Sequence, residues 1–596
     1  MYVPESCELN REVQREALTG VPIGQPLSRE RILNLDVDAF YSAEDSMHRR
    51  ALASAGAVQR GPRPWHVGTR FVREPGDLPL DRVGASQTAR IRKARSLKLM
   101  MHGWEKSDLG IVAVKSANKA ARAAAESMEP RPGAKENTSQ SNKYQTQSRE
   151  RLSQRLDRVR ERAKSHKTER FTSLLHYLTP EVLALAFSWL KRDAASGVDG
   201  VTWKEYEANQ QERLADLHQR VHRGGFRALP SKRKFIPKAD GRLRPLGIAA
   251  LEDKIVQRAV VEVLNAIYEQ DFLGFSYGFR PKRSQHDALD ALAVGIDKRN
   301  VNWILDADVS KFFDTVDHDW LMTFMGHRIS DPRVLRLIQK WLKAGVLDAG
   351  EYQETEEGTP QGAVISPLLA NVYLHYVFDL WAHQWRGRHA IGKVTLVRYA
   401  DDIVVGFQYQ KDAERFLAAM RERLQSFGLE LHPEKTRLLA FGRFATAYRR
   451  QNGARKSETF NFLGFTHISG RDRHGNFQLQ RHTRRDRMRA ALQRVKQTLR
   501  RRWHWKIPEQ GKWLGQVVRG YFGYHAVPTN FRRIDAFRHF VVDLWRRALK
   551  RRSQKDNMTW HRIERLAADW IPKPRITHPW PSTRFLVKYP RQEPGA

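Results

Sequence analysis

The sequence predicts a protein of the α+β class that is built from several domains. A chain of 596 residues is too long for a single hydrophobic core. Two β-rich stretches, 394–397 and 403–405, flank a short acidic turn and predict a hairpin. After about residue 444, apolar residues recur at helical spacing and predict amphipathic helices. Between residues 173 and 444 helical and strand patterns alternate, so both helices and sheets are expected there.

Composition narrows the partners and the compartment. The chain has 104 Lys and Arg against 66 Asp and Glu, a formal net charge of +38. So large an excess predicts a polyanionic partner, with nucleic acid the first choice. No run of about 18 apolar residues occurs, and the start of the chain lacks a signal-peptide pattern, so no membrane association is predicted. Cys7 is the only cysteine, which excludes internal disulfides and cysteine-rich zinc sites and fits a cytoplasmic (in bacteria, nucleoid-associated) protein.

The acidic turn at 399–402 is the main candidate for chemistry. The predicted hairpin places Asp401 and Asp402 at its tip, where two neighbouring anions need a compensating charge, usually a divalent metal. A third carboxylate, Asp308, lies in a predicted strand that contains Ile304, Leu305 and Val309 and ends at the Phe pair 312–313. Two Mg²⁺ ions held by carboxylates can clamp the attacking and leaving oxygens of a phosphoryl displacement. The alternative interpretation of an isolated acidic pair is a solvated loop.

Short motifs occur in a fixed order along the chain. They lie at 196–200, 235–238, 244–248, 276–281, 303–314, 359–362, 399–402, 432–436 and 462–465. Any one of them could arise by chance, but in this order they resemble the reverse transcriptases of the group II intron maturase family. Together with the basic C-terminal region, the resemblance covers roughly residues 150–596.

The resemblance implies a fold and an activity. The expected fold is a right-hand polymerase with fingers, a palm containing an antiparallel sheet, a helical thumb and a basic N-terminal extension. The expected activity is RNA-directed DNA synthesis with Mg²⁺, with Asp308, Asp401 and Asp402 as catalytic metal ligands. The implied partners are a structured intron RNA, a DNA target with its primer, and deoxynucleoside triphosphates. The protein would assist splicing of the intron and copy it into DNA at the target during retrohoming.

The resemblance also implies five nucleotide-binding residues. Phe313 matches the aromatic gate that excludes a 2′-hydroxyl, and Gln361 matches a residue that lines the incoming nucleotide. Lys238 and Arg244 match cations of the fingers that reach the triphosphate. Lys435 matches the lysine that protonates the pyrophosphate leaving group. The alternative interpretations are an ordinary core residue for Phe313, a simple turn around Gln361 and a solvated charge for Lys435.

The chain divides into seven predicted segments. They are a region without a clear domain pattern (1–128), a flexible polar linker (129–148), a basic N-terminal extension (149–230), fingers and palm (231–445), a connection (446–479), a helical thumb or maturase domain (480–552) and a DNA-binding tail (553–596). The extension begins with a helix whose apolar face is Leu152, Leu156 and Val159.

The thumb is expected to bind RNA. Arginines crowd its first helix, and those expected to contact nucleic acid are Arg484, Arg485, Arg494, Arg501 and Arg502. The buried stripe of the same helix is predicted to be Met488, Leu492, Val495 and Leu499. The nearby tryptophans, Trp503, Trp505 and Trp513, are expected to be mostly core, the alternative being stacking on unpaired bases.

The sequence differs from many relatives at its C-terminal end. Those relatives carry a metal-dependent endonuclease built on cysteine pairs, whereas no cysteine follows Cys7 here. The expectation is therefore a protein that borrows its DNA primer. Two other functions stay open. One is a domesticated reverse transcriptase for phage defence or CRISPR adaptation, and the other is an RNA-binding splicing factor with an idle polymerase.

Overall fold

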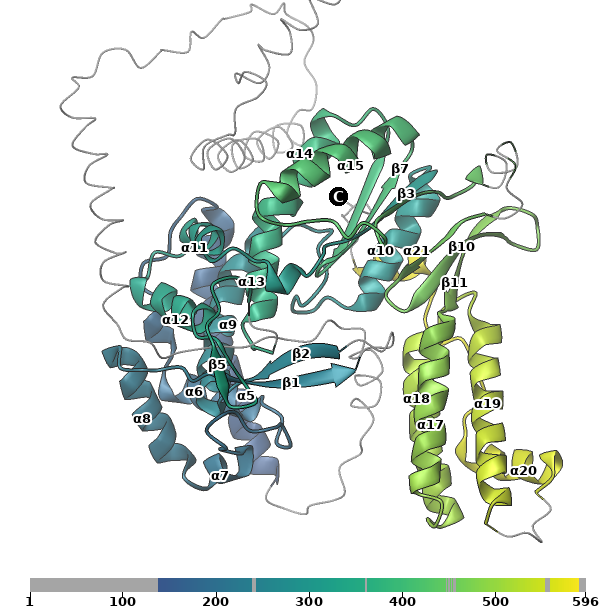
Figure 1. Ribbon diagram of the computed structural model, residues 1–596, viewed down its shortest axis with the longest axis horizontal. Coiled ribbons are helices and arrows are strands. Elements are labelled where there is room, and N and C mark those ends of the chain that lie inside the picture. Colours follow the sequence, from purple (N-terminus) through teal and green to yellow (C-terminus); the bar gives the residue numbers. More distant parts are fainter. Residues whose placement is uncertain are drawn as a thin grey trace, which may run out of the picture. The chain divides into compact units, whose positions relative to one another are not determined.

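The computed structural model describes residues 138–237, 243–359, 362–445, 448, 451, 453, 457–552 and 558–588. All of them belong to one compact unit, Glu74–Ala596. The predicted region 1–128 and the nucleotide-site candidates Lys238 and Gln361 lie outside the described residues. Helices combine with three separate sheets in the described ranges, so the predicted α+β class is confirmed (Figure 1).

The first described helix is α5 (Thr138–Ser165), which packs along α6 (Pro180–Ser188) and α9 (Leu251–Asp271). The predicted apolar stripe is buried in it: Leu152, Leu156 and Val159. The helix begins earlier than the sequence predicts, so residues 138–148 are helical rather than part of a linker. A polar helical turn has no apolar periodicity, and pattern analysis therefore misses it.

A buried arginine fastens the end of α5. Arg328 follows α11 (His318–Gly326), and its Nε donates to Asp271 Oδ2 at 2.9 Å. Its other nitrogens donate, at 2.5 to 3.0 Å, to the carbonyl oxygens of Ala163, His166, Lys167 and Glu169. Carbonyls at the end of a helix have no intrahelical donor. Arg328 satisfies them while its own charge is paired with a carboxylate.

A small sheet has the strand order β2-β1-β4-β5. Its strands are β1 (Ser231–Pro237), β2 (Leu243–Ile248), β4 (Val346–Asp348) and β5 (Glu351–Gln353). β1 pairs antiparallel with β2 and parallel with β4. The neighbouring elements in the sequence are η1 (Leu175–Tyr177), α7 (Trp203–Ala208), α8 (Gln210–Arg223) and α12 (Pro332–Leu342).

The central sheet contains the predicted hairpin. Its strand order is β6-β7-β3-β8, and every neighbouring pair is antiparallel. The strands are β6 (Val394–Tyr399), β7 (Asp402–Phe407), β3 (Trp303–Asp308) and β8 (Arg437–Ala440). β6 is buried along its whole length.

Helices cover this sheet and lead into it. α10 (Gln285–Lys298) packs on β6 and β7, and α15 (Gln410–Gln425) packs on β3 and β7 (Figure 1). α13 (Ser366–Leu374) continues through a π-helical turn, η3 (His375–Asp379), into α14 (Leu380–Arg388). A π-helical turn inserts an extra residue into a helix, and such turns often occur near functional sites.

A third sheet was missed by the sequence analysis, which predicted only a connection at 446–479. It consists of β9 (Thr459–Phe462), β10 (Phe465–Arg471) and β11 (Phe477–Thr483), with β10 in the middle. The 462–465 motif is the hairpin turn between β9 and β10. Leu463 and Gly464 both have positive φ, 44° and 84°, as a tight two-residue turn between twisted strands requires.

The three predicted C-terminal helices are present as α17 (Arg485–Arg501), α18 (Ile507–His525) and α19 (Phe531–Lys550). Of the predicted stripe on α17, Val495 and Leu499 are buried, and Met488 and Leu492 pack against the same core at partial burial. No helix in the described part of the chain is long and apolar enough to cross a membrane.

The last two helices are docked on the rest of the protein. α20 (Trp560–Trp570) packs on α18 and α19, and α21 (Pro581–Lys588) packs on α10. Asp290 of α10 forms ion pairs with Arg584 of α21 and, at 3.1 Å, with Arg481 of β11. Phe585 is buried in the core that α10 shares with the central sheet. The described part of the predicted tail therefore has a structural role.

Asp290→Ala is expected to lower the free energy of unfolding by about 3 to 5 kcal/mol, because it leaves the buried Arg481 without its carboxylate. Urea unfolding measures the change. The control is Asp216→Ala, which removes the partner of Arg220 in an exposed ion pair and is expected to cost less than about 1 kcal/mol. Equal losses in the two variants would contradict the structural role of Asp290.

Candidate active site

The ends of three strands bring the predicted carboxylates together. In the antiparallel register Asp308 of β3 lies directly opposite Asp402 of β7, and Tyr399 of β6 lies opposite Asp402 on the other side. Side chains directly opposite in such a pair are close neighbours, and like charges there are destabilising. Asp401, in the turn itself, is only 2% exposed. The site therefore concentrates negative charge at one end of the strands, which is called the acidic edge of the sheet below.

The turn that carries Asp401 is unusually tight. Only Ala400 and Asp401 lie between the paired residues 399 and 402. Ala400 has φ 58°, a left-handed conformation that costs a non-glycine residue about 1 to 3 kcal/mol. The surrounding structure must therefore hold the turn in place.

A lysine neutralises part of the acidic edge. Lys435 Nζ lies 2.5 Å from Asp308 Oδ2. Its loop is fixed to β3 by backbone hydrogen bonds, because His432 N donates to Asp308 O at 2.8 Å and Ser310 N donates to Glu430 O at 2.7 Å. The predicted residue Lys435 is thus brought to the carboxylates by a rigid connection, although its own side chain is about half exposed.

Asp306 is a further acidic residue that the predicted site did not include. The pKa of Asp306 is raised to about 6, mainly by burial; Arg437 opposes the increase, and the nearby charges of Asp402 and Asp308 contribute to it. Arg437 faces Asp306 across the β3–β8 pair, with Nη2 3.5 Å from Oδ2. The two-residue strand alternation places Asp306 on the face of Asp308, so this signal was available in the sequence.

The first C-terminal helix is close enough to the turn to affect its electrostatics. Burial lowers the pKa of Arg487 of α17, and the neighbouring Arg484 lowers it further. The negative charges of Asp486 and Asp402 act in the opposite direction. The start of α17 therefore lies within electrostatic range of the acidic turn.

Within the described residues, no three His, Cys, Asp or Glu side chains are gathered closely enough to hold a metal ion. The chemistry of the donors at the turn nonetheless fits Mg²⁺, which prefers carboxylate oxygens. Asp308 and Asp402 face one another from different strands, and the elevated pKa of Asp306 arises partly from their charge. A divalent cation would balance the negative charge of such a group of carboxylates.

Phe313 follows Asp308 by five residues and lies in a short 3₁₀ turn, η2 (Phe312–Asp314). Both rings of the turn are buried and meet edge to face at 5.2 Å. The loop before position 361 is attached to this turn, because Thr359 N donates to Phe313 O at 2.7 Å. Gly358 makes the approach possible, since a Cβ there would lie 2.8 Å from Phe313 O. Phe313 and the 359–362 motif therefore form one structural group.

The other predicted residues are more widely spread. Arg244 is half-buried in β2, opposite Ile236 of β1. Arg485, Arg494 and Arg501 are exposed on α17. The other two of the five arginines predicted to contact nucleic acid have contacts within the protein. Arg484 pairs with Asp486 at 2.8 Å, and Arg502 stacks over Trp505 at 4.0 Å.

The tryptophans near the thumb differ from the expectation that most are core. Trp503 is 56% exposed, so that expectation is wrong for this residue. Trp505 and Trp513 are half-buried, and the guanidinium carbon of Arg502 lies 4.0 and 5.5 Å from the centres of their rings. The sequence could not distinguish these cases, because a tryptophan at the end of a helix has no periodic neighbours to set its orientation.

A cavity of about 1390 Å³ opens between α5, α9 and residues 362–368. Its lining includes basic side chains from separate elements: Arg149, Arg160, Lys254, Arg258 and Lys282. It is far larger than a typical small-molecule site, and its positive charge suits a polyanion.

Comparisons with known proteins identify the class. A family model described as "Reverse transcriptase (RNA-dependent DNA polymerase)" matches residues 236–467, which include the carboxylates and most of the central sheet. The chain is 34% identical over 317 residues to Protein YkfC of Escherichia coli K12, a match that covers 48% of this chain and 78% of YkfC. The protein is therefore a reverse transcriptase, an RNA-directed DNA polymerase.

Other relatives narrow the class. The group II intron-encoded protein LtrA of Lactococcus lactis is 35% identical over 225 residues, or 37% of each chain. The putative COX1/OXI3 intron 1 protein of Saccharomyces cerevisiae is 28% identical over 308 residues, which cover 43% of this chain and 36% of the yeast protein. The chain belongs to the group II intron reverse transcriptase/maturase family. Because it spans little more than a third of LtrA, the activities of that whole protein do not transfer directly.

A buried histidine lies behind the site, at the start of the π-helical turn. His375 is fully buried, and its ring meets that of Phe272 at 5.5 Å. Its pKa is lowered to about 3, mainly by burial and also by the charges of Arg398 and Arg280. The folded protein therefore keeps this imidazole neutral, whereas the unfolded chain takes up a proton near pH 6.5.

His375→Leu is expected to make folding less sensitive to acid. A depressed histidine pKa gives stability that is present at high pH and is lost as the pH falls below the unfolded value. Between pH 7 and pH 5 the native protein should lose about 2 kcal/mol more than the variant. Urea unfolding at both pH values measures the difference. His474→Leu replaces an exposed histidine and is the control: its free energy of unfolding should differ from that of the native protein by the same amount at pH 7 and at pH 5. The same outcome for His375→Leu would contradict the conclusion that the folded protein keeps this imidazole neutral.

Proposed function

We propose that Asp308, Asp401 and Asp402 are the catalytic carboxylates of this reverse transcriptase and that they hold Mg²⁺. The observation that carries the proposal is the register of β3 and β7, which sets Asp308 opposite Asp402 next to the turn containing Asp401. The bound ions would stabilise the charge on the attacking 3′-oxygen and on the departing pyrophosphate.

The chain's own residues would perform the remaining steps. Lys435, hydrogen-bonded to Asp308 at 2.5 Å, is in position to donate a proton to the leaving pyrophosphate. Phe313 would stack under the sugar and reject a 2′-hydroxyl. Lys238, Arg244 and Gln361 would bind the deoxynucleoside triphosphate. In this proposal the small sheet belongs to the fingers, the central sheet to the palm, and α17–α19 to the thumb.

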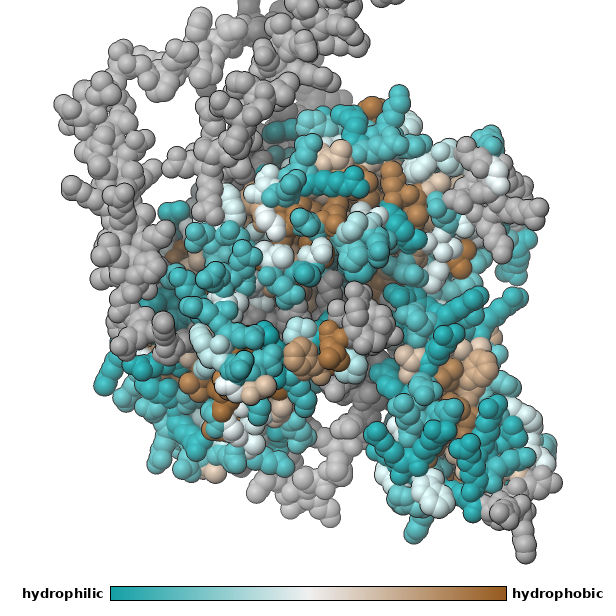
Figure 2. All heavy atoms as spheres, viewed as in Figure 1, coloured by the Kyte–Doolittle hydropathy of each residue, from teal (hydrophilic) through white to brown (hydrophobic). Residues whose placement is uncertain are grey.

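The nucleic-acid partners follow from the charged surfaces. The large basic cavity beside α5 suits the template RNA. The visible face of the C-terminal helices is mostly hydrophilic (Figure 2). Arg485, Arg494 and Arg501 of α17 are exposed. Exposed arginines bind phosphates, and the exposed ring of Trp503 can stack on an unpaired base.

These features support the family's RNA role for this chain. The thumb would hold a structured intron RNA in its active shape and assist splicing. The polymerase would then copy the intron into DNA from a primer at a DNA target, which is the retrohoming reaction. The formal charge of +38 favours a protein that works on nucleic acid throughout this cycle.

Asp401→Asn and Asp402→Asn are each expected to lower primer extension on an RNA template more than about 100-fold, because each removes a charge at the reacting centre. Extension with Mg²⁺ measures this, with Asp297→Asn on the surface of α10 as an active control. Splicing of the intron RNA should persist in both variants. Full extension by either variant would exclude that carboxylate, and loss of splicing with the fold intact would contradict the separation of the two roles.

Phe313→Ala is expected to raise the incorporation of ribonucleotides relative to deoxynucleotides by about 10-fold or more, since the gate would no longer contact the sugar. Competing nucleotides in a single-turnover extension give the ratio. Phe312→Ala is a matched control, because its ring is equally buried and its loss should destabilise the protein similarly without altering selectivity. An unchanged ratio for Phe313→Ala would remove it as the gate.

A further inference from the structure

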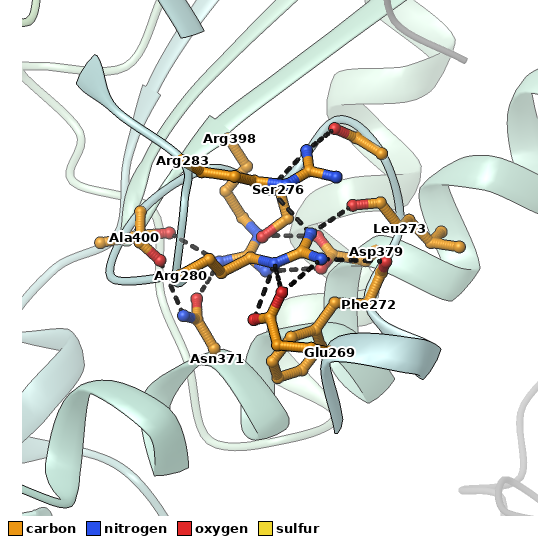
Figure 3. A network of polar contacts seen from close by, with 12 residues as sticks. Glu269, Phe272, Leu273, Ser276, Arg280, Arg283, Asn371, Asp379, Arg398 and Ala400 are labelled. Carbon is orange, nitrogen blue, oxygen red and sulfur yellow. Dashed lines mark hydrogen bonds and ion pairs between the residues drawn. The ribbon is translucent and has the colours of Figure 1, made fainter. Parts of the chain in front are cut away.

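The acidic turn is supported from behind by one buried arginine. Arg398 is the second-last residue of β6, and none of its surface is exposed. Its Nε and Nη2 donate to the two carboxylate oxygens of Asp379 at 2.6 and 2.5 Å. Its Nη1 donates to Ala400 O at 3.1 Å (Figure 3). One guanidinium thus joins the π-helical turn to the backbone of the acidic turn.

A neighbouring asparagine extends the same support. Arg398 Nη1 also donates to Asn371 Oδ1 at 3.0 Å, and Asn371 Nδ2 donates to Gly278 O at 2.7 Å (Figure 3). Gly278 lies directly against the turn, because a Cβ added there would clash with the backbone nitrogen of Ala400. The turn is therefore confined both by hydrogen bonds and by close backbone packing.

These contacts explain the 276–281 motif. Its backbone pairs with β6: Tyr277 N donates to Arg398 O at 2.8 Å, and Arg398 N donates to Phe275 O at 2.9 Å. Arg280 holds the segment in shape by donating to Glu269 and, at 2.7 and 2.9 Å, to the carbonyl oxygens of Leu273 and Ser276 (Figure 3). The motif builds a rigid wall behind the turn.

The buried hydrogen bonds and ion pair of Arg398 contribute little to the free energy of unfolding compared with an apolar core. A fully buried ion pair is often no more stabilising than a pair of apolar side chains of the same size. What an apolar pair lacks is direction: it cannot hold the Ala400 carbonyl at a fixed point. Ala400 has a positive φ that a non-glycine residue keeps only when its surroundings impose it.

We propose that Arg398 is a positioning residue, which acts with Asp379 and Asn371 to fix the Ala400 carbonyl and so sets the placement of Asp401 and Asp402 for Mg²⁺. The inference rests on the proposed role of those two carboxylates. It assigns to Arg398 no contact with substrate. A carboxylate displaced by about 1 Å would cost roughly 100-fold in rate.

The central test replaces the ion pair by apolar side chains of similar size. Arg398→Met/Asp379→Leu removes both buried charges together, so the fold and RNA binding should persist. Primer extension should fall about 100-fold, and Mn²⁺ binding followed by electron paramagnetic resonance should weaken about 10-fold. Full activity with native Mn²⁺ affinity in the folded double variant would overturn the inference, because the network would then be only structural.

A second variant displaces the turn without touching any charge. Gly278→Ala introduces a methyl group against the backbone of Ala400 and should likewise weaken Mn²⁺ binding and extension. Gly387→Ala is the matched control, since a Cβ at Gly387 in α14 meets nothing within 4 Å and should leave both unchanged. Native behaviour of Gly278→Ala would also contradict the inference, even if the double variant failed to fold.

Asp401→Asn separates this inference from the proposed function. If Asp401→Asn extends primers and binds Mn²⁺ normally, the proposed carboxylate site is wrong and the inference fails with it. If Asp401→Asn is inactive while the Arg398→Met/Asp379→Leu and Gly278→Ala variants behave as the native protein does, only the inference fails.

Discussion

The antiparallel register of β3 and β7 is the constraint on which the rest of the site depends. It sets Asp308 opposite Asp402. A slip of one residue would turn Asp308 to the other face of the sheet, because side chains alternate along a strand. The register is held by burial: β6 is buried throughout, β7 nearly so, and β8 pairs with the other edge of β3. An apolar sheet thus fixes the position of charged groups at its edge.

Cations on the two sides of this edge act differently. On the β8 side, Lys435 contacts a carboxylate of the site and is half exposed, so a ligand can compete with it. On the β6 side, Arg398 is fully buried and contacts the turn only through a backbone carbonyl. The first cation suits the proposed chemistry, because its exposed side chain can exchange partners. The second cation holds the structure in place, because a buried charge that loses its partner strongly destabilises the folded protein.

The sequence predicted those parts of the protein that depend on local patterns. The hairpin around residues 399–402 was predictable because apolar strands flank a two-residue turn, and the three C-terminal helices were predictable from their apolar stripes. Arg398 was not, since its partner Asp379 lies on a π-helical turn that no periodicity indicates. The β9–β11 sheet was missed because its strands mix polar with apolar residues, and the start of α5 was missed because its first turns are polar.

The C-terminal helices are tied to the acidic turn through buried charges. Arg481, just before α17, pairs with Asp290 of α10, and α10 packs on β6, the strand that carries Arg398. At the start of α17, the negative charge of Asp402 partly offsets the lowering of the pKa of Arg487 by burial. Polymerisation requires the nucleic acid and the carboxylates to be aligned within about 1 Å. Directional ion pairs fix such an alignment where apolar contacts alone would allow sliding. The C-terminal helices and the end of the central sheet that carries the carboxylates are therefore held as one framework, which explains why charges are buried at a position where an apolar core would be equally stable.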